Sequence, residues 1–147
     1  MRELTVGRVI GAALVLAVVM GGIVLGVFAY YAVAANRAKD VPASPEVNAA
    51  FAEARRSWIS HMDIPVHRLA LSSAEEYGSG NYVFVFDVYA WFGVGVGYAA
   101  PSCGGGGILR YGGFAGIGDN SDPTYLEEAR AQCTRAHGAV RVLAPAP

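Results

Sequence analysis

The sequence predicts an α+β fold, in which a single N-terminal transmembrane helix precedes a small antiparallel-sheet domain with two helices. One uncharged apolar run near the N-terminus is long enough to cross a bilayer. Two later segments repeat apolar residues at helical spacing, and the segments between them are dense in the aromatic and β-branched residues that favour strands. The chain has 147 residues, which leaves room for one domain beside the apolar helix.

The apolar run extends from Val9 to Ala35 and contains no charged residue. A helix of this length spans roughly 40 Å at about 1.5 Å per residue. That exceeds the roughly 30 Å hydrocarbon core of a bilayer, so a tilted spanning helix fits. Tyr30 and Tyr31 lie where an interfacial aromatic belt is expected.

A cleaved signal peptide is the alternative interpretation of this run. Ala32-Val33-Ala34 resembles a small-residue cleavage site, but the run is longer than the roughly 7–15 apolar residues of a signal peptide. We therefore predict a retained anchor. The predicted division of the chain is a tail at 1–8, a transmembrane helix at 9–35, a linker at 36–45, a domain at 46–143 and a tail at 144–147.

The two cysteines bear on the orientation of this anchor, which the flanking positive charges do not decide. Cys103 and Cys133 both follow the anchor and do not form a CxxC pair. An even count of cysteines is typical of a structural disulfide in an oxidising compartment. We expect a short cytoplasmic tail and a C-terminal domain outside the cytoplasm, either periplasmic or extracellular.

The first half of the domain is predicted to contain a helix and two strands. Ser44-Pro45-Glu46 supplies a capping hydroxyl, a first-turn proline and an early acid, and the Ile64-Pro65 step ends the helix. A short strand over 66–72 and a turn or loop over 72–81 follow. Residues 82–92 give the strongest strand signal, and both faces of this strand are largely apolar, so both need cover.

The second half is predicted to contain a glycine-weakened strand over 108–118, a helix, and a short edge strand over 139–143. Asp122 caps this second helix and Gly138 ends it. One face of the helix points towards the sheet and consists of Leu126, Ala129, Cys133 and Ala136. Cys133 can therefore meet the loop that carries Cys103, and we expect both helices on one face of the sheet.

Glycines alternate with larger residues in the stretch "WFGVGVGY". A row of glycines on one face of a strand lets a ring, a helix or another backbone come close. The pattern is GxGxG rather than GxGxxG, and no lysine follows a glycine, so a phosphate-binding loop is not indicated. The candidate interaction face comprises Tyr89, Trp91, Gly93, Gly95 and Gly97.

No constellation of residues predicts an enzyme, a metal site or a cofactor site. His61, Asp63 and His67 do not have the spacing of a known metal motif. Asp87 is the one charge in the main strand, with Arg110 as its expected partner. Ser102 and Cys103 have no histidine placed by the sequence to activate them. The net charge of −1 and the scattered basic residues give no electrostatic case for nucleic acid.

Small residues recur at four-residue spacing along the anchor, and such faces let transmembrane helices approach closely. They are Gly7, Gly11, Ala13, Ala17, Gly21, Gly22 and Gly26. The leading hypothesis is an accessory subunit or assembly factor that contacts the bilayer and other membrane protein subunits through this helix and the apolar sheet face. The alternative is a membrane-tethered envelope domain whose ligand pocket is the wall from Tyr89 to Tyr98. An enzyme is the third hypothesis, and it would need a polar cluster that sequence spacing does not reveal.

Overall fold

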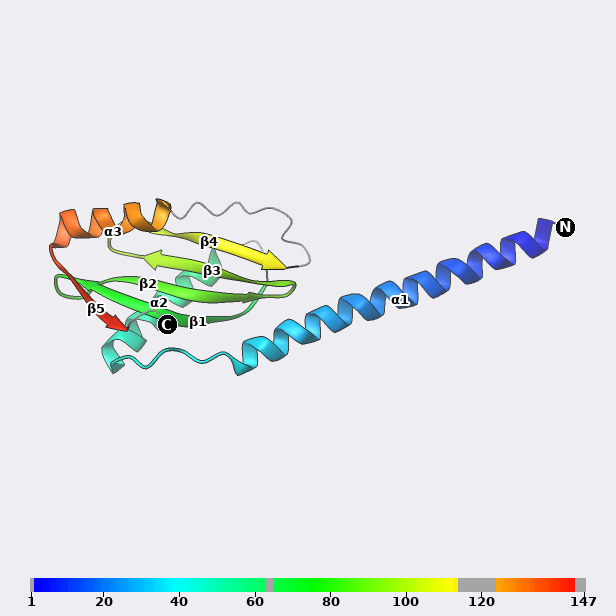
Figure 1. Ribbon diagram of the computed structural model, residues 1–147, viewed down its shortest axis with the longest axis horizontal. Helices are drawn as coiled ribbons and strands as arrows, with labels where there is room; N and C mark the ends of the chain where they lie inside the picture. Colours follow the sequence, from blue (N-terminus) through cyan, green and yellow to red (C-terminus); the bar gives the residue numbers. More distant parts are fainter. Residues whose placement is uncertain (1, 63–64, 114–123, 145–147) are drawn as a thin grey trace. The chain divides into compact units, whose positions relative to one another are not determined.

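The computed structural model describes residues 2–62, 65–113 and 124–144 and has an α+β arrangement (Figure 1). The chain forms two compact units, of which the first ends at Tyr30 and the second begins at Tyr31. The N-terminal helix α1 covers Arg2–Arg37, and its segment Gly7–Arg37 has a mean hydropathy of 2.6. This helix is long and apolar enough to cross a membrane, and a signal helix meets the same criterion.

The second unit contains a five-stranded antiparallel sheet in the order β4-β3-β2-β1-β5. Its strands are β1 (Val66–Tyr77), β2 (Asn81–Ala90), β3 (Gly93–Ala100), β4 (Gly105–Gly113) and β5 (Val140–Ala144). The helices are α2 (Pro45–Ser60) and α3 (Thr124–His137). β5 is an edge strand beside β1, as the sequence predicts.

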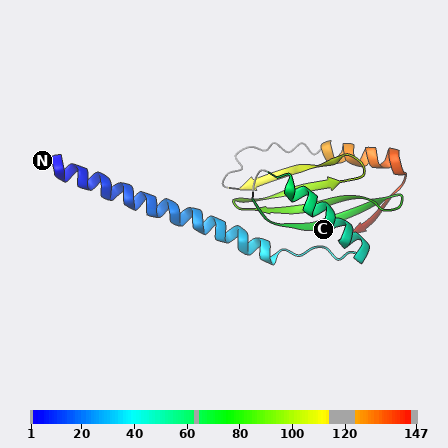
Figure 2. The ribbon, with the colours of Figure 1, turned by 180° about the vertical axis from the view of Figure 1, so that it is seen from behind.

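The two helices lie on opposite faces of the sheet, so the prediction that both share one face is wrong. Phe84 and Phe86 of β2 pack against Phe51 of α2, with ring centroids 5.4 and 5.8 Å apart. Val83, on the other face of β2, packs in a second cluster with Cys133 of α3. Figure 2 shows α2 in front of the sheet. The physical reason is that β2 is apolar on both faces and each face requires its own cover.

The α2 helix begins as its sequence predicts. The Ser44 side chain accepts a hydrogen bond from the backbone N–H of Val47 (3.3 Å), and Pro45 occupies the first turn. The buried residues of its cluster come from α2 and from the same face of β1, β2 and β3. They are Val47, Phe51, Ala54, Leu69, Leu71, Ala74, Phe84, Phe86, Val88 and Ala99.

The α3 helix is held by the disulfide and by an ion pair. Cys103 and Cys133 are bonded, with their Cα atoms 5.0 Å apart, and this is the cysteine pairing that the sequence predicts. The Arg130 guanidinium donates to both carboxylate oxygens of Glu75 on β1, at 3.0 and 2.5 Å. Tyr77 also donates to Glu75 (2.8 Å). On the predicted inner face of α3, Ala129 and Cys133 are buried, whereas Ala136 is exposed.

Several strands begin or end at other residues than the sequence predicts. β1 extends to Tyr77 because a register shift between Leu71 and Ser73 lets the strand continue, so the turn shrinks to residues 78–80. Gly78 and Gly80 adopt the positive φ values that this tight turn requires (64° and 76°). β4 begins at Gly105 rather than at 108. The predicted strand end at 114–118 and the Asp122 cap lie outside the described residues.

The predicted linker is bonded to the sheet. β5 pairs with β1 from Ala74 to Tyr77, and no strand of the described residues lies beside the earlier part of this β1 edge. There the backbone N–H of Leu71 donates to the Asp40 carboxylate (2.8 Å), and its carbonyl accepts from the N–H of Val41 (2.9 Å). These two hydrogen bonds satisfy the backbone N–H and carbonyl of Leu71, which would otherwise be unpaired at the edge of the sheet.

Candidate functional site

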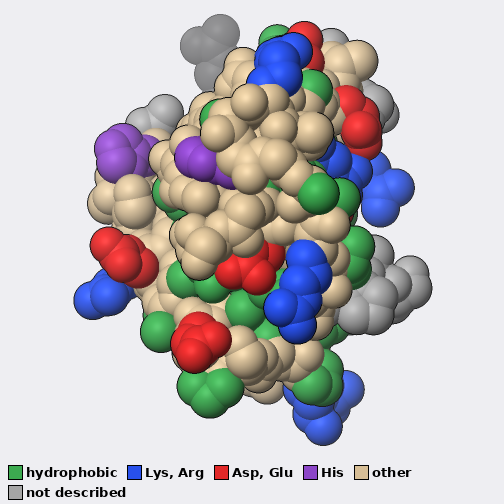
Figure 3. All heavy atoms as spheres, turned by 90° about the vertical axis from the view of Figure 1, so that its left-hand side faces the viewer, with side chains coloured by type: hydrophobic (Ala, Val, Ile, Leu, Met, Phe, Trp, Pro, Cys, Tyr) green, Lys and Arg blue, Asp and Glu red, His purple; other side chains and the backbone are tan. Residues whose placement is uncertain are grey.

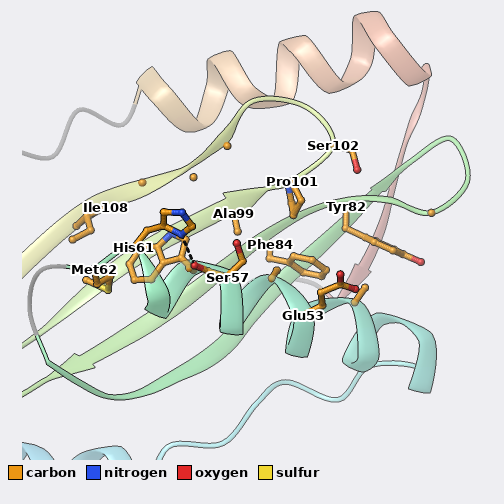
Figure 4. A pocket seen from close by; sticks show the side chains of 17 residues that line it. Glu53, Ser57, His61, Met62, Tyr82, Phe84, Ala99, Pro101, Ser102 and Ile108 are labelled. Carbon is orange, nitrogen blue, oxygen red and sulfur yellow. Dashed lines mark hydrogen bonds between the residues drawn. The ribbon is translucent and has the colours of Figure 1, made fainter.

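A groove of about 1000 Å³ lies between α2 and the corner where β3 passes into β4. Figure 4 shows Glu53 and Ser57 of α2, and His61 directly after the helix, facing Pro101 and Ile108 across it. Phe84 and Ala99 contribute from the sheet between them. The groove is open to solvent and mostly apolar, which is typical of ligand sites.

Glycines make the room for this groove and for the ring that borders it. A Cβ on Gly106 would lie 3.1 Å from Cδ1 and Nε1 of the Trp58 indole, and a Cβ on Gly97 would lie 3.1 Å from its Cζ2. The indole also meets Phe86 edge-on, with ring centroids 5.0 Å apart. Trp58 therefore lies against two strands at positions where neither strand has a side chain.

The same row of glycines holds a second ring further along β3. A Cβ on Gly95 would lie 2.8 Å from Cδ2 of Tyr111 and 2.5 Å from the carbonyl oxygen of Arg110. The Tyr111 side chain likewise lies 2.9 Å from the position of a Cβ on Gly93. The alternating glycines are therefore sites of close ring packing, one of the uses that the sequence predicts for them.

The described lining of the groove carries an acidic side chain but no lysine or arginine. Among the described residues that line it, Glu53 is the one acidic side chain, and neither lysine nor arginine is present. His61 closes one end, where its Nδ1–H donates to the carbonyl oxygen of Ser57 (2.7 Å). Elsewhere charges of both signs mix: on the end of the domain in Figure 3, acidic and basic side chains are interspersed.

Tyr82 and Phe84 form an aromatic wall near Glu53 (Figure 4). Their rings are stacked, with centroids 5.5 Å apart and planes inclined by 23°. Burial raises the pKa of the Tyr82 phenol, and the carboxylates of Glu76 and Glu46 raise it further. This end of the groove therefore combines aromatic faces with negative potential.

The predicted interaction face does not form one surface. In the β2–β3 register, Ala90 lies opposite Gly93, whereas Tyr89 lies opposite Val94. The glycines therefore share the α2 face, and Tyr89 points to the other. Trp91 is in the turn between the strands, 42% exposed, with its ring stacked on His67 at 6.3 Å.

The other residues singled out from the sequence stay apart. β3 lies between β2 and β4, with Val96 paired to both Asp87 and Arg110, so no ion pair joins these two in the described part of the chain. Cys103 is committed to the disulfide. No group of three metal-binding side chains occurs within the described ranges, and Asp63 lies outside them.

The groove itself was missed at the sequence level, although the helix that ends at the Ile64-Pro65 step and the later glycine-weakened strand were both predicted. The signal that could have found it is the run Gly104–Gly107. A strand with consecutive glycines cannot fill the space under a helix.

The predicted packing face of α1 is open. Its five glycines are Gly7, Gly11, Gly21, Gly22 and Gly26. A Cβ built at any of them would meet no atom within 4 Å. The helix therefore presents a surface on which a second helix could approach closely.

Comparison with known proteins finds no matching family model, no matching curated protein and no matching solved structure. The open face of α1, the disulfide and the groove are the observations that bear on function.

Proposed function

We propose that the chain is a single-pass membrane protein with a small extracytoplasmic interaction domain, and that it is an accessory subunit or assembly factor of a larger membrane protein complex. The open small-residue face of α1 is the observation that carries this proposal. Transmembrane helices associate by close backbone approach at such faces, and a Cβ built at any of the five glycines of α1 would meet no atom of the described residues within 4 Å.

The location of the domain outside the cytoplasm is part of this proposal. Disulfides persist in oxidising compartments and are rare in the cytosol, so the bond between Cys103 and Cys133 supports it. In cells treated with a thiol-reactive polymer without reductant, both cysteines should stay unmodified, and both should react after reduction. Labelling without reductant would contradict the disulfide, and a lack of labelling after reduction of intact cells would contradict this location.

Native electrophoresis of the full chain extracted in a mild detergent tests the subunit proposal. We expect a species larger than the monomer that contains a second membrane protein. The double substitution Gly22→Leu and Gly26→Leu should abolish it, because leucine holds the helices apart. The control Val24→Leu lies on another side of α1 and should leave it intact. A lone monomer in the unmodified protein would contradict the proposal.

The groove favours a second candidate function, a membrane-tethered domain that binds a ligand in the cell envelope. The volume of about 1000 Å³ and the aromatic lining suit a small molecule. The site differs from the one the sequence predicts, because the groove lies beyond the wall from Tyr89 to Tyr98. Its lining instead comes from α2 and the two residues after it, from Gly80, Tyr82 and Phe84, and from residues 99–108.

A further inference from the structure

We propose that the groove binds a small organic cation, an ammonium group carried on an apolar body. This inference rests on the ligand-binding function proposed above and names the chemistry of that same site. It follows from three properties of the groove: its apolar end, the single carboxylate among its described lining residues, and the partly exposed Tyr82 ring beside that carboxylate.

The apolar body of the ligand is matched by one end of the groove. In Figure 4, Met62 and Ile108 lie at the end away from Glu53, beside the helix turn that carries Ser57 and His61. Trp58 lines the groove next to them, and its indole lies against Gly106. An aryl or alkyl group placed here would be surrounded by apolar side chains, which favours its transfer from water.

The cationic group is matched by the opposite end. Glu53 projects from α2 beside Phe84 and Tyr82 in Figure 4. The Glu53 carboxylate attracts an ammonium group by charge, and the partly exposed Tyr82 ring, which is stacked on the buried Phe84, attracts it through its ring face. No lysine or arginine lines the groove within the described residues, so neither competes with the ligand for Glu53 there.

An anionic or neutral ligand fits less well. The carboxylates of Glu46 and Glu76 raise the pKa of Tyr82, so negative charge also lies near the phenol of this residue. An anion would meet these carboxylates, and no lysine or arginine among the described lining residues would offset them. A neutral apolar molecule would contact the apolar end of the groove but would lack the charge attraction of Glu53.

The test uses the full-length protein in nanodiscs of neutral lipid, with the Trp91→Phe substitution so that Trp58 is the single tryptophan. Its fluorescence is titrated with phenethylammonium, phenethyl alcohol and phenylacetate, which share a ring and differ in charge. We expect saturable quenching or a spectral shift, with the ammonium bound about tenfold more tightly than the alcohol and phenylacetate weakest.

Two matched variants locate the charge. Glu53→Gln keeps the shape of the side chain and should weaken phenethylammonium binding by up to about fivefold, with the alcohol unchanged. Glu128→Gln makes the same change on α3, on the far face of the sheet, and should alter neither affinity. Equal effects of the two substitutions would overturn the assignment of Glu53.

The remaining outcomes separate this inference from the function on which it rests. Equal binding of ammonium and alcohol would overturn the cation assignment but leave the groove a ligand site. No binding of any probe up to millimolar concentration would overturn both. The blocked peptide acetyl-glycyl-lysyl-glycine amide tests whether the ammonium group comes instead from a lysine side chain of a protein. Its binding in place of phenethylammonium would overturn the small-molecule assignment.

Discussion

Replacing Gly97 by alanine tests whether close ring packing is the reason for the glycine row in β3. A Cβ at this position would lie 2.7 Å from Cε2 of Phe86 and 3.1 Å from Cζ2 of Trp58. Real Cβ atoms essentially never come within 3.0 Å of another heavy atom. Phe86 is fully buried, so its ring has no space into which it can move freely. Adding atoms to such a core costs about 1–3 kcal/mol, and we expect the free energy of unfolding to fall by about 2 kcal/mol.

The measurement is thermal unfolding of the full-length protein in detergent, followed by near-ultraviolet circular dichroism, which reports the packed aromatic rings rather than α1. A loss of about 2 kcal/mol lowers the Tm of a domain of this size by roughly 6–12 °C. The matched control is Gly112→Ala, where a Cβ would meet only the Val94 carbonyl oxygen, at 3.8 Å. That variant should unfold within about 0.5 kcal/mol of the unmodified protein.

A companion substitution makes the test specific to the contact. Phe86→Leu shortens the side chain that a Cβ on Gly97 would strike, so the double variant should lose less stability than the sum of the two single variants. We expect a coupling of at least about 0.5 kcal/mol. If Gly97→Ala unfolds at the same temperature as the unmodified protein, or if the two losses simply add, the close-packing explanation is refuted.

Three further predictions concern the α3 face. Arg130→Met leaves the Glu75 carboxylate, whose side chain is 13% exposed, without its cation, and should lower the free energy of urea unfolding by about 1–3 kcal/mol; an unchanged midpoint would contradict this. Burial and the hydrogen bond to Glu75 raise the pKa of Tyr77 to about 12. The contribution of Tyr77 to stability is therefore complete below pH 10 and is lost as the pH rises from 10 towards 12. The fall in the free energy of unfolding over this range should be smaller in Tyr77→Phe. Reduction of the bond between Cys103 and Cys133, which are 30 residues apart, should lower the free energy of urea unfolding by about 3–4 kcal/mol. An unchanged free energy of unfolding after complete reduction would argue against the chain-entropy account.

Local patterns in the sequence predicted the helices and the main strand. The uncharged run, the Ser44 cap and the β-branched and aromatic residues of β2 each act within a few neighbouring residues, because capping bonds and side-chain periodicity are short-range properties. The pairing of Cys103 with Cys133 could also be predicted, since the chain has two cysteines and α3 turns one of them towards the sheet.

The tertiary structure decided which surfaces meet. Asp87 and Arg110 looked like partners on successive strands, yet the strand order places β3 between them. Strands lie about 4.8 Å apart, so the two residues are separated by roughly 10 Å. The placement of α2 and α3 on opposite faces also depended on how the whole sheet is covered, and the periodicity of either helix contains no information about that.

The groove likewise depends partly on local sequence and partly on the tertiary structure. The sequence by itself predicted its parts: a helix that ends at the Ile64-Pro65 step, and a glycine-weakened strand over 108–118. Only the fold brought the indole against Gly97 and Gly106 and placed Glu53 beside Tyr82 and Phe84. The physical reason is that a groove is the space left between elements distant in the chain, and this space depends on long-range packing that no local pattern encodes.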